Sequence, residues 1–116
     1  MHELSITQGM LDIALDKARE ARASRITAIN LVIGEISNIV DDCIQFYFNF
    51  LSRDSIARDA KLSFTRIPMQ VRCRSCRSCG FSFAPEKPAW SCPQCRKWDA
   101  EIVAGQELYI DSIEVE

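Results

Sequence analysis

The second half of the chain is dominated by closely spaced cysteines. Five of the six cysteines in the 116 residues lie between positions 73 and 95. They are Cys73, Cys76, Cys79, Cys92 and Cys95. A Cys-x-x-Cys turn can place two thiolates on one ion, and zinc takes four thiolates in a tetrahedron at about 2.3 Å. Since four protein sulfurs leave no open position on the metal, the spacing predicts a structural zinc site in a small module over residues 72–98.

The first half of this module offers three cysteines for two ligand positions, because Arg-Ser-Cys occurs twice in tandem, at 74–76 and 77–79. The favoured ligand set is Cys76, Cys79, Cys92 and Cys95. Gly80 follows Cys79, and a residue free to take positive φ lets backbone amides turn toward a sulfur. The rival pair, Cys73 with Cys76, would leave Cys79 without a metal, so Cys73 stays an alternative ligand.

Two other interpretations of the cysteines are weaker. A thioredoxin-like redox site needs a single Cys-x-x-Cys at a helix start in a βαβ setting, whereas this chain has two pairs with proline and glycine around them. Disulfides are rare in the cytoplasm. We expect a cytoplasmic protein, because no run approaches the ~20 apolar residues of a membrane span and no cationic segment precedes an apolar core near Glu3. The sixth cysteine, Cys43, is predicted to be a small core residue.

The remaining sequence predicts an α+β fold. Apolar periodicity predicts helices at 5–23 and 41–53, and strands at 25–36, 61–71, 101–104 and 107–115. Ser5 is the expected N-cap of the first helix. Gly34 marks a bulge or a close approach of two backbones. We therefore expect two helices packed on a small mixed β-sheet, formed by residues 1–71 plus 99–116, with a zinc-ribbon module inserted at residues 72–98.

Basic residues gather in and beside the cysteine module. They are Arg66, Arg72, Arg74, Arg77, Lys87, Arg96 and Lys97, against the single acid Glu86 within residues 66–97. One interpretation is a nucleic-acid-binding zinc ribbon, for which a basic patch is typical. The favoured one is charge balance, since cations beside thiolates help to hold them deprotonated and the whole chain carries a net charge of −2. Nucleic acid is therefore the less favoured partner, and a zinc hydrolase is disfavoured by the closed ligand shell.

The first three residues, Met1-His2-Glu3, form a nitrogen-rich donor set. The α-amine, the backbone nitrogen of His2 and its imidazole can close adjoining chelate rings around one ion. Glu3 adds another backbone nitrogen and a carboxylate. Such donor sets suit Ni(II) or Cu(II) in tetragonal or square-planar geometry. On this chemistry alone, the alternative that His2, the single histidine of the chain, is an idle exposed residue is favoured.

Five motifs together resemble the HypA/HybF family over essentially the whole chain. They are the Met-His-Glu-Leu-Ser start, Ile33-Gly34-Glu35, a Cys-x-x-Cys pair, Cys92-Pro-Gln-Cys95 and the ending Ser112-Ile113-Glu114-Val115-Glu116. Members of that family are nickel metallochaperones for [NiFe]-hydrogenase maturation, not enzymes. The one departure is the extra Arg-Ser-Cys, since relatives show two clean cysteine pairs.

The resemblance implies a role for each metal. His2 would anchor Ni(II), with Met1 and Glu3 contributing, so residues 1–71 plus 99–116 would be a nickel-binding domain. Four of the cysteines would hold structural Zn²⁺ within residues 72–98. The implied partners are the GTPase HypB, the [NiFe]-hydrogenase large subunit and, in some relatives, urease accessory proteins, with no membrane involved. The sequence leaves the oligomeric state open, and a homodimer is compatible with it.

Overall fold

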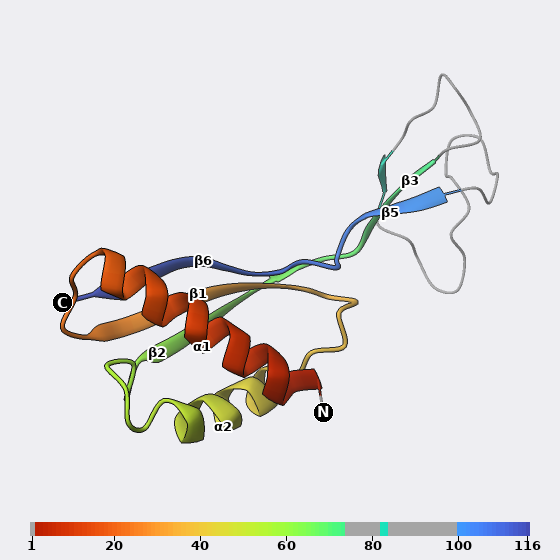
Figure 1. Ribbon diagram of the computed structural model, residues 1–116. Coiled ribbons are helices and arrows are strands. Elements are labelled where there is room, and N and C mark those ends of the chain that lie inside the picture. The colour runs from red at the N-terminus through yellow and green to blue at the C-terminus, as the bar shows by residue number, and fades with distance from the viewer. Residues whose placement is uncertain (1, 74–81, 84–99) are drawn as a thin grey trace. The chain divides into compact units, whose positions relative to one another are not determined.

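A computed structural model describes residues 2–73, 82–83 and 100–116 of the chain (Figure 1). Its elements, in chain order, are α1 (His2–Glu20), β1 (Ile26–Gly34), α2 (Asp41–Leu51), β2 (Lys61–Ile67), β3 (Gln70–Cys73), β4 (Ser82–Phe83), β5 (Ala100–Ala104) and β6 (Leu108–Val115). They belong to two compact units, each of which is described by itself. The units comprise Met1–Ile33, Asn38–Thr65 and Leu108–Glu116 in the first, and Gly34–Ser37 and Arg66–Glu107 in the second.

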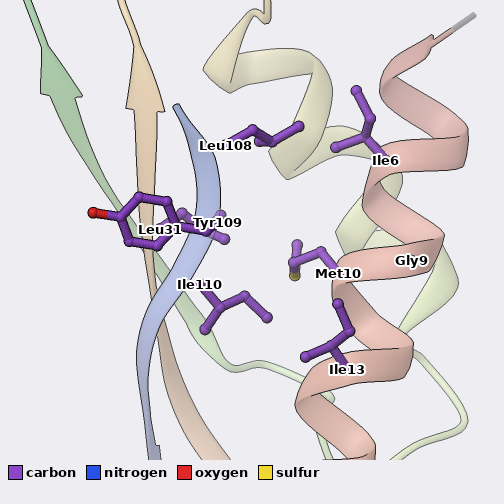
Figure 2. Close-up of a pocket in the computed structure, with 8 residues that line it drawn as sticks. All are labelled: Ile6, Gly9, Met10, Ile13, Leu31, Leu108, Tyr109 and Ile110. Carbon is purple, nitrogen blue, oxygen red and sulfur yellow. The ribbon is translucent and has the colours of Figure 1, made fainter. Parts of the chain in front are cut away.

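The first unit is a three-stranded sheet in the order β2-β1-β6, with α1 and α2 packed on it (Figure 1). β1 and β6 are antiparallel, with Ile29 opposite Ile113. The arrows of β1 and β2 point the same way (Figure 2), so the sheet is mixed. The predicted α+β class, two helices on a small mixed β-sheet, is confirmed.

The core of the first unit lies between the helices and the middle strand. Ile29 and Ile33 of β1 are 0% exposed, and Phe48 of α2 is 1% exposed. Ala14 and Ala18 of α1 are also fully buried, and these small side chains let the helix approach its neighbours closely. Each large apolar side chain buried in this way stabilises the folded state by about 1.5–3 kcal/mol. The cluster of buried residues that forms this core contains no cysteine. The core of the first unit is therefore built from apolar side chains and does not require a metal.

Helix α1 begins at His2, so the predicted start at Ser5 is wrong. The hydroxyl of Thr7, which is fully buried, donates to the backbone carbonyl of Glu3 at 2.5 Å and ties the first turn to the second. Acidic Glu3 lies in the first turn, where it suits the positive end of the helix dipole. The helix therefore includes the residues that were predicted to precede its cap.

The second unit contains a three-stranded sheet in the order β4-β3-β5, and both pairings are antiparallel. The strand predicted at 61–71 is divided into β2 and β3 on either side of Pro68 and Met69, because proline has no backbone amide to donate to a ladder. This unit reaches from Arg66 to Glu107, beyond the predicted module at 72–98, because β3 and β5 flank the cysteine segment and pair with each other.

Two glycines lie side by side where β1 and β5 end. A Cβ added to Gly34 would collide with the backbone carbonyl of Gly105, and Gly105 itself has φ +112°, which favours glycine. The Gly34 amide donates to the Glu107 carbonyl at 2.7 Å, and the Ile36 amide donates to the Gly105 carbonyl at 2.9 Å. The close backbone approach predicted at Gly34 is confirmed, and it leaves no room for any side chain there.

Candidate metal centres

The predicted zinc ligands lie outside the described residues. These are Cys76, Cys79, Cys92 and Cys95. Within residues 2–73, 82–83 and 100–116, no group of three or more histidine, cysteine or acidic side chains is arranged to hold a metal ion. The structure does describe strands β3 and β5, which flank the cysteine-containing residues 74–99.

The base of this cysteine segment is the pairing of β3 with β5. Cys73, the last residue of β3, lies opposite Ala100, the first residue of β5, in an antiparallel register. Opposite residues in such a ladder have Cα atoms about 4.5–5.5 Å apart. The two ends of segment 74–99 therefore start from adjacent positions, so much of the entropic cost of closing that loop is met by the strand pairing and not by the metal. A base of this kind favours bringing both cysteine pairs to one ion.

Cys73 belongs to the strand itself. Its side chain is 3% exposed, and it lies on the same face of β3 as Val71, which is 0% exposed, because alternate residues of a strand share a face. A thiol packed on the buried face beside Val71 is consistent with a small apolar core residue. Cysteines that hold a structural zinc are buried as well, so the choice among the first three cysteines stays a prediction.

We expect Cys73→Ser to keep one zinc per chain and Cys79→Ser to lose zinc affinity by at least tenfold, a loss of about 1.4 kcal/mol or more. Elemental analysis and competition with a chelator would measure both. Cys73→Ser should still lower the melting temperature, because it places a hydroxyl at a buried position. If instead Cys73→Ser loses the metal and Cys79→Ser keeps it, Cys73 and Cys76 are the ligand pair.

At the other predicted site, the structure describes the backbone of His2 and all of Glu3, while Met1 and the His2 side chain lie outside the described parts. Because α1 begins at His2, the amides of His2 and Glu3 belong to the first turn, where no intrahelical carbonyl accepts from them. Their nitrogens are therefore not committed to the helix ladder. Glu3 is partly buried and has a further interaction of its own.

Thr7 is a residue near this site that sequence reasoning missed. Its hydroxyl bond to the Glu3 carbonyl fixes the backbone of the first turn from a fully buried position. The available signal was a hydroxyl residue four positions after Glu3, a spacing at which serine and threonine bond back to a helix carbonyl.

One member of the basic cluster is paired in the structure. Arg72 on β3 donates through Nε at 3.1 Å and through Nη2 at 2.6 Å to the same carboxylate oxygen of Glu101 on β5. Arg66 donates to the Gly34 carbonyl at 3.4 Å. The other five basic residues lie outside the described residues. Arg66 and Arg72 both donate hydrogen bonds to other residues of the chain. These contacts favour a structural role for the two arginines over phosphate binding.

Cys43 was predicted to be a core residue, and this is wrong, because its side chain is exposed on α2. The buried face of α2 is formed by Ile44 and Phe48. A residue next to Ile44 in sequence points about 100° away from it around the helix. The apolar neighbours Phe46 and Phe50 are exposed as well, at 70% and 61%.

The first unit also holds an apolar pocket of about 230 Å³ between α1 and the strands (Figure 2). It is lined by Ile6, Gly9, Met10, Ile13, Leu31, Leu108, Tyr109 and Ile110. The phenol oxygen of Tyr109 points away from α1 in Figure 2, so the side-chain atoms that line the pocket are carbons and the Met10 sulfur. These groups provide neither a carboxylate nor an imidazole, and the pocket is unsuited to Ni(II).

Residues 1–115 match the family model for HypA, which is described as a hydrogenase/urease nickel incorporation metallochaperone. The chain belongs to the HypA family. Among the relatives of this family, the hydrogenase maturation factor HypA of Dehalococcoides mccartyi is 47% identical over 116 residues, covering 100% of this chain and 95% of the relative. The hydrogenase maturation factor HypA of Caldanaerobacter subterraneus subsp. tengcongensis is 36% identical over 117 residues, covering 100% of both chains. The resemblance predicted from the motifs is confirmed.

Solved HypA structures share the fold. A solution structure of a HypA protein matches with a TM-score of 0.79 at 23% identity, over 100% of this chain and 97% of the other. The solution structure of the Ni metallochaperone HypA from Helicobacter pylori matches with a TM-score of 0.69 at 22% identity, over 97% and 96% of the two chains. The family is thus one of metallochaperones, and no helix among the described residues is long and apolar enough to cross a membrane.

Proposed function

We propose that this chain binds Ni(II) at its N-terminus and delivers it during [NiFe]-hydrogenase maturation, while a structural zinc ion holds its cysteine module together. The observation that carries the proposal is the HypA family match over residues 1–115, which includes the Met-His-Glu start. The fold adds that helix α1 begins at His2, where backbone nitrogens are free of helix hydrogen bonds.

The proposed nickel donors are Met1, His2 and Glu3. His2 contributes its imidazole and backbone nitrogen, Met1 its α-amine, and Glu3 its backbone nitrogen. The positive end of a helix dipole opposes a cation by about 0.3–1 kcal/mol at an exposed site. The helix start therefore weakens a nickel complex slightly, and the charge must be offset by the donors themselves. A terminal site of few ligands on such a helix suits a carrier that has to release its metal.

The proposed zinc ligands are Cys76, Cys79, Cys92 and Cys95. Four thiolates complete a tetrahedral shell, so the zinc would have a structural role. The antiparallel base at Cys73 and Ala100 supports the proposal, because it starts both halves of the ligand set from adjacent positions.

The proposed partners follow from the family. They are a HypB-type GTPase, which would promote nickel transfer, and the [NiFe]-hydrogenase large subunit, which would receive the metal. Urease accessory proteins are further candidates, since the family model covers both hydrogenase and urease nickel incorporation. A GTP-dependent exchange would take place in the cytoplasm. The alternative of a nucleic-acid-binding zinc ribbon is less well supported, because Arg72 is occupied by Glu101.

The proposal predicts that the zinc-loaded chain binds one nickel ion and that His2→Ala lowers its nickel affinity by at least about 100-fold. The reason is that losing an imidazole that touches the metal costs more than the 10–100-fold typical of losing a group that only hydrogen-bonds to a ligand. Calorimetric titration with Ni²⁺ would measure the affinity. Gln8→Ala is the matched control, because Gln8 is an exposed polar residue on the same helix and should leave nickel binding unchanged.

The same two variants test delivery. In cells that lack their own HypA protein, the native chain and Gln8→Ala should restore nickel-dependent hydrogenase activity, and His2→Ala should not. If His2→Ala binds and delivers nickel like the native chain, the N-terminal assignment is wrong.

A further inference from the structure

Strand β6 forms one edge of the sheet of the first unit. In the order β2-β1-β6, one side of β6 pairs with β1, and within the described part of the chain no strand pairs with its other side. The backbone amides and carbonyls that point to that side are therefore not used by this sheet. An edge of this kind, which here runs from Leu108 to Val115, can accept a further strand.

The apolar pocket lies between β6 and helix α1 (Figure 2). Leu108 and Ile110 point from β6 toward the helix, and Tyr109 between them points away, because successive residues of a strand face opposite sides. On the helix, residues 6, 9, 10 and 13 share one face because of their spacing. We call this space, lined by the eight residues of the pocket, the β6–α1 groove.

The helix side of the β6–α1 groove is only partly covered by the sheet. A Cβ built on Gly9 has no other atom within 4 Å, so there is open space in front of this residue. Ile13, one turn further along α1, is 53% exposed, and Leu108 on the strand is 41% exposed. A strand added beside β6 would place every second side chain against this apolar surface of α1.

The two walls of the β6–α1 groove require different chemistry from one occupant. The edge of β6 needs backbone amides and carbonyls, and the face of α1 needs apolar side chains. A helix has most of its backbone groups bonded internally, and a small apolar molecule has no groups for the strand edge. An extended peptide supplies both, because its backbone joins the ladder while alternate side chains enter the groove.

The charge of β6 indicates what the other side chains of this peptide should be. Residues 107–116 carry four acidic side chains and no basic one, namely Glu107, Asp111, Glu114 and Glu116. Glu114 shares a face with Tyr109, because the residues of β1 opposite them are four apart, and that face is turned away from α1. A second β6 strand would bring like charges together, whereas lysine or arginine at alternate positions of the added strand would complement the acids.

We propose that the β6–α1 groove binds an extended segment of a partner protein, which joins the sheet as a fourth strand beside β6. Apolar residues at every second position face α1, and one of them enters the pocket. The residues between them are basic and lie on the same face as Tyr109. None of the groove residues is a proposed metal ligand, so this interaction is separate from the proposed nickel and zinc binding.

A labelled peptide with the sequence Lys-Val-Lys-Val-Lys-Val-Lys and blocked ends tests the proposal on the zinc-loaded full chain. Fluorescence anisotropy should show saturable binding of one peptide per chain, with a Kd on the order of 10–100 µM. The same peptide with glutamate in place of lysine should bind at least about tenfold more weakly, because its charges repel those of β6. A peptide of the original composition with its three valines adjacent should also lose at least about tenfold, because they cannot all face α1.

N-methylation of the peptide distinguishes strand addition from other modes of binding. A methyl group on an amide that points to β6 removes a donor and blocks the approach of the strand, whereas one on an outward amide does neither. Because successive amides of a strand point to opposite edges, peptides methylated on the valines or on two of the lysines present opposite methylated edges. We expect one of them to bind like the parent peptide and the other at least about tenfold more weakly.

A substitution at Gly9 tests the groove from the side of the protein. Gly9→Leu should fill the open space and weaken binding of the parent peptide at least about tenfold. Its melting temperature should not fall, because leucine favours a helix interior more than glycine does. Gln8→Leu is the matched control, because Gln8 is exposed on α1 and does not line the groove. It should bind the peptide like the native chain.

Three results would each overturn the proposal. The first is a native chain that does not bind the parent peptide at concentrations up to about 1 mM. The second is equal binding of the two methylated peptides, since strand addition uses only one edge. The third is undiminished binding to a folded Gly9→Leu chain, which would place the peptide outside the β6–α1 groove.

Discussion

Adding one residue before Met1 should abolish tight nickel binding while zinc stays bound. The extension converts the α-amine of Met1 into an amide and moves the new amine one residue away from the His2 imidazole. The chelate rings that share the His2 backbone nitrogen then no longer include a terminal amine. We expect the nickel affinity to fall by at least about 100-fold, or 2.7 kcal/mol or more. Calorimetric titration of the extended, zinc-loaded chain with Ni²⁺ would measure the loss.

The helix start makes this test specific. Helix α1 is anchored behind the first turn by the Thr7 hydroxyl, by buried Met10 and Leu11 and by fully buried Ala14. An extra residue at the end should therefore leave the fold unchanged, and the melting temperature provides the check. An extension placed after Glu116 is the matched control and should bind nickel normally. Equal nickel affinity of the N-terminally extended and native chains would place nickel elsewhere, most plausibly on thiolates of the cysteine module.

Cys92→Ala should remove zinc and loosen the cysteine module while the first unit stays folded. Structural zinc contributes apparent binding free energies of about 10–16 kcal/mol in small modules, as large as the whole stability of a typical domain. The first unit has a separate core around Ile29, Ile33 and Phe48, none of which is more than 1% exposed. If zinc binds as proposed, only the second unit depends on it, and we expect the two units to respond differently to loss of the metal.

Elemental analysis and amide hydrogen exchange would follow the two effects of Cys92→Ala separately. Zinc should fall from one per chain to nearly none, and amides of β3 and β5 should exchange faster, while amides of β1 keep their protection. Cys43→Ala is the matched control, because Cys43 is an exposed thiol on α2 and should keep both the metal and the protection. Full zinc content in Cys92→Ala would mean that Cys92 is not a ligand.

Local sequence patterns predicted which helices and strands form better than they predicted where each element begins or which of its faces is buried. The helix at 41–53 and the strand at 107–115 agree closely with α2 and β6, because both depend on periodicity over neighbouring residues. The start of α1 was expected at Ser5, whereas the helix begins at His2. On α2, the apolar periodicity did not show that Cys43 would be exposed. Phe48 is buried and Phe46 is exposed because of what packs against each side of the helix.

The sequence by itself determined the family and the candidate donors, because ligand chemistry is carried by residue type and short spacing. A Met-His-Glu start and repeated Cys-x-x-Cys turns specify nitrogen and sulfur donors whatever surrounds them. Only the tertiary structure decided which distant segments meet. Gly34 against Gly105, and Cys73 opposite Ala100, join positions far apart in the chain, and such contacts depend on strand pairing that no local pattern encodes. The same non-local packing exposed Phe46 and Phe50 on α2, since a helix face becomes surface only when nothing else in the fold covers it.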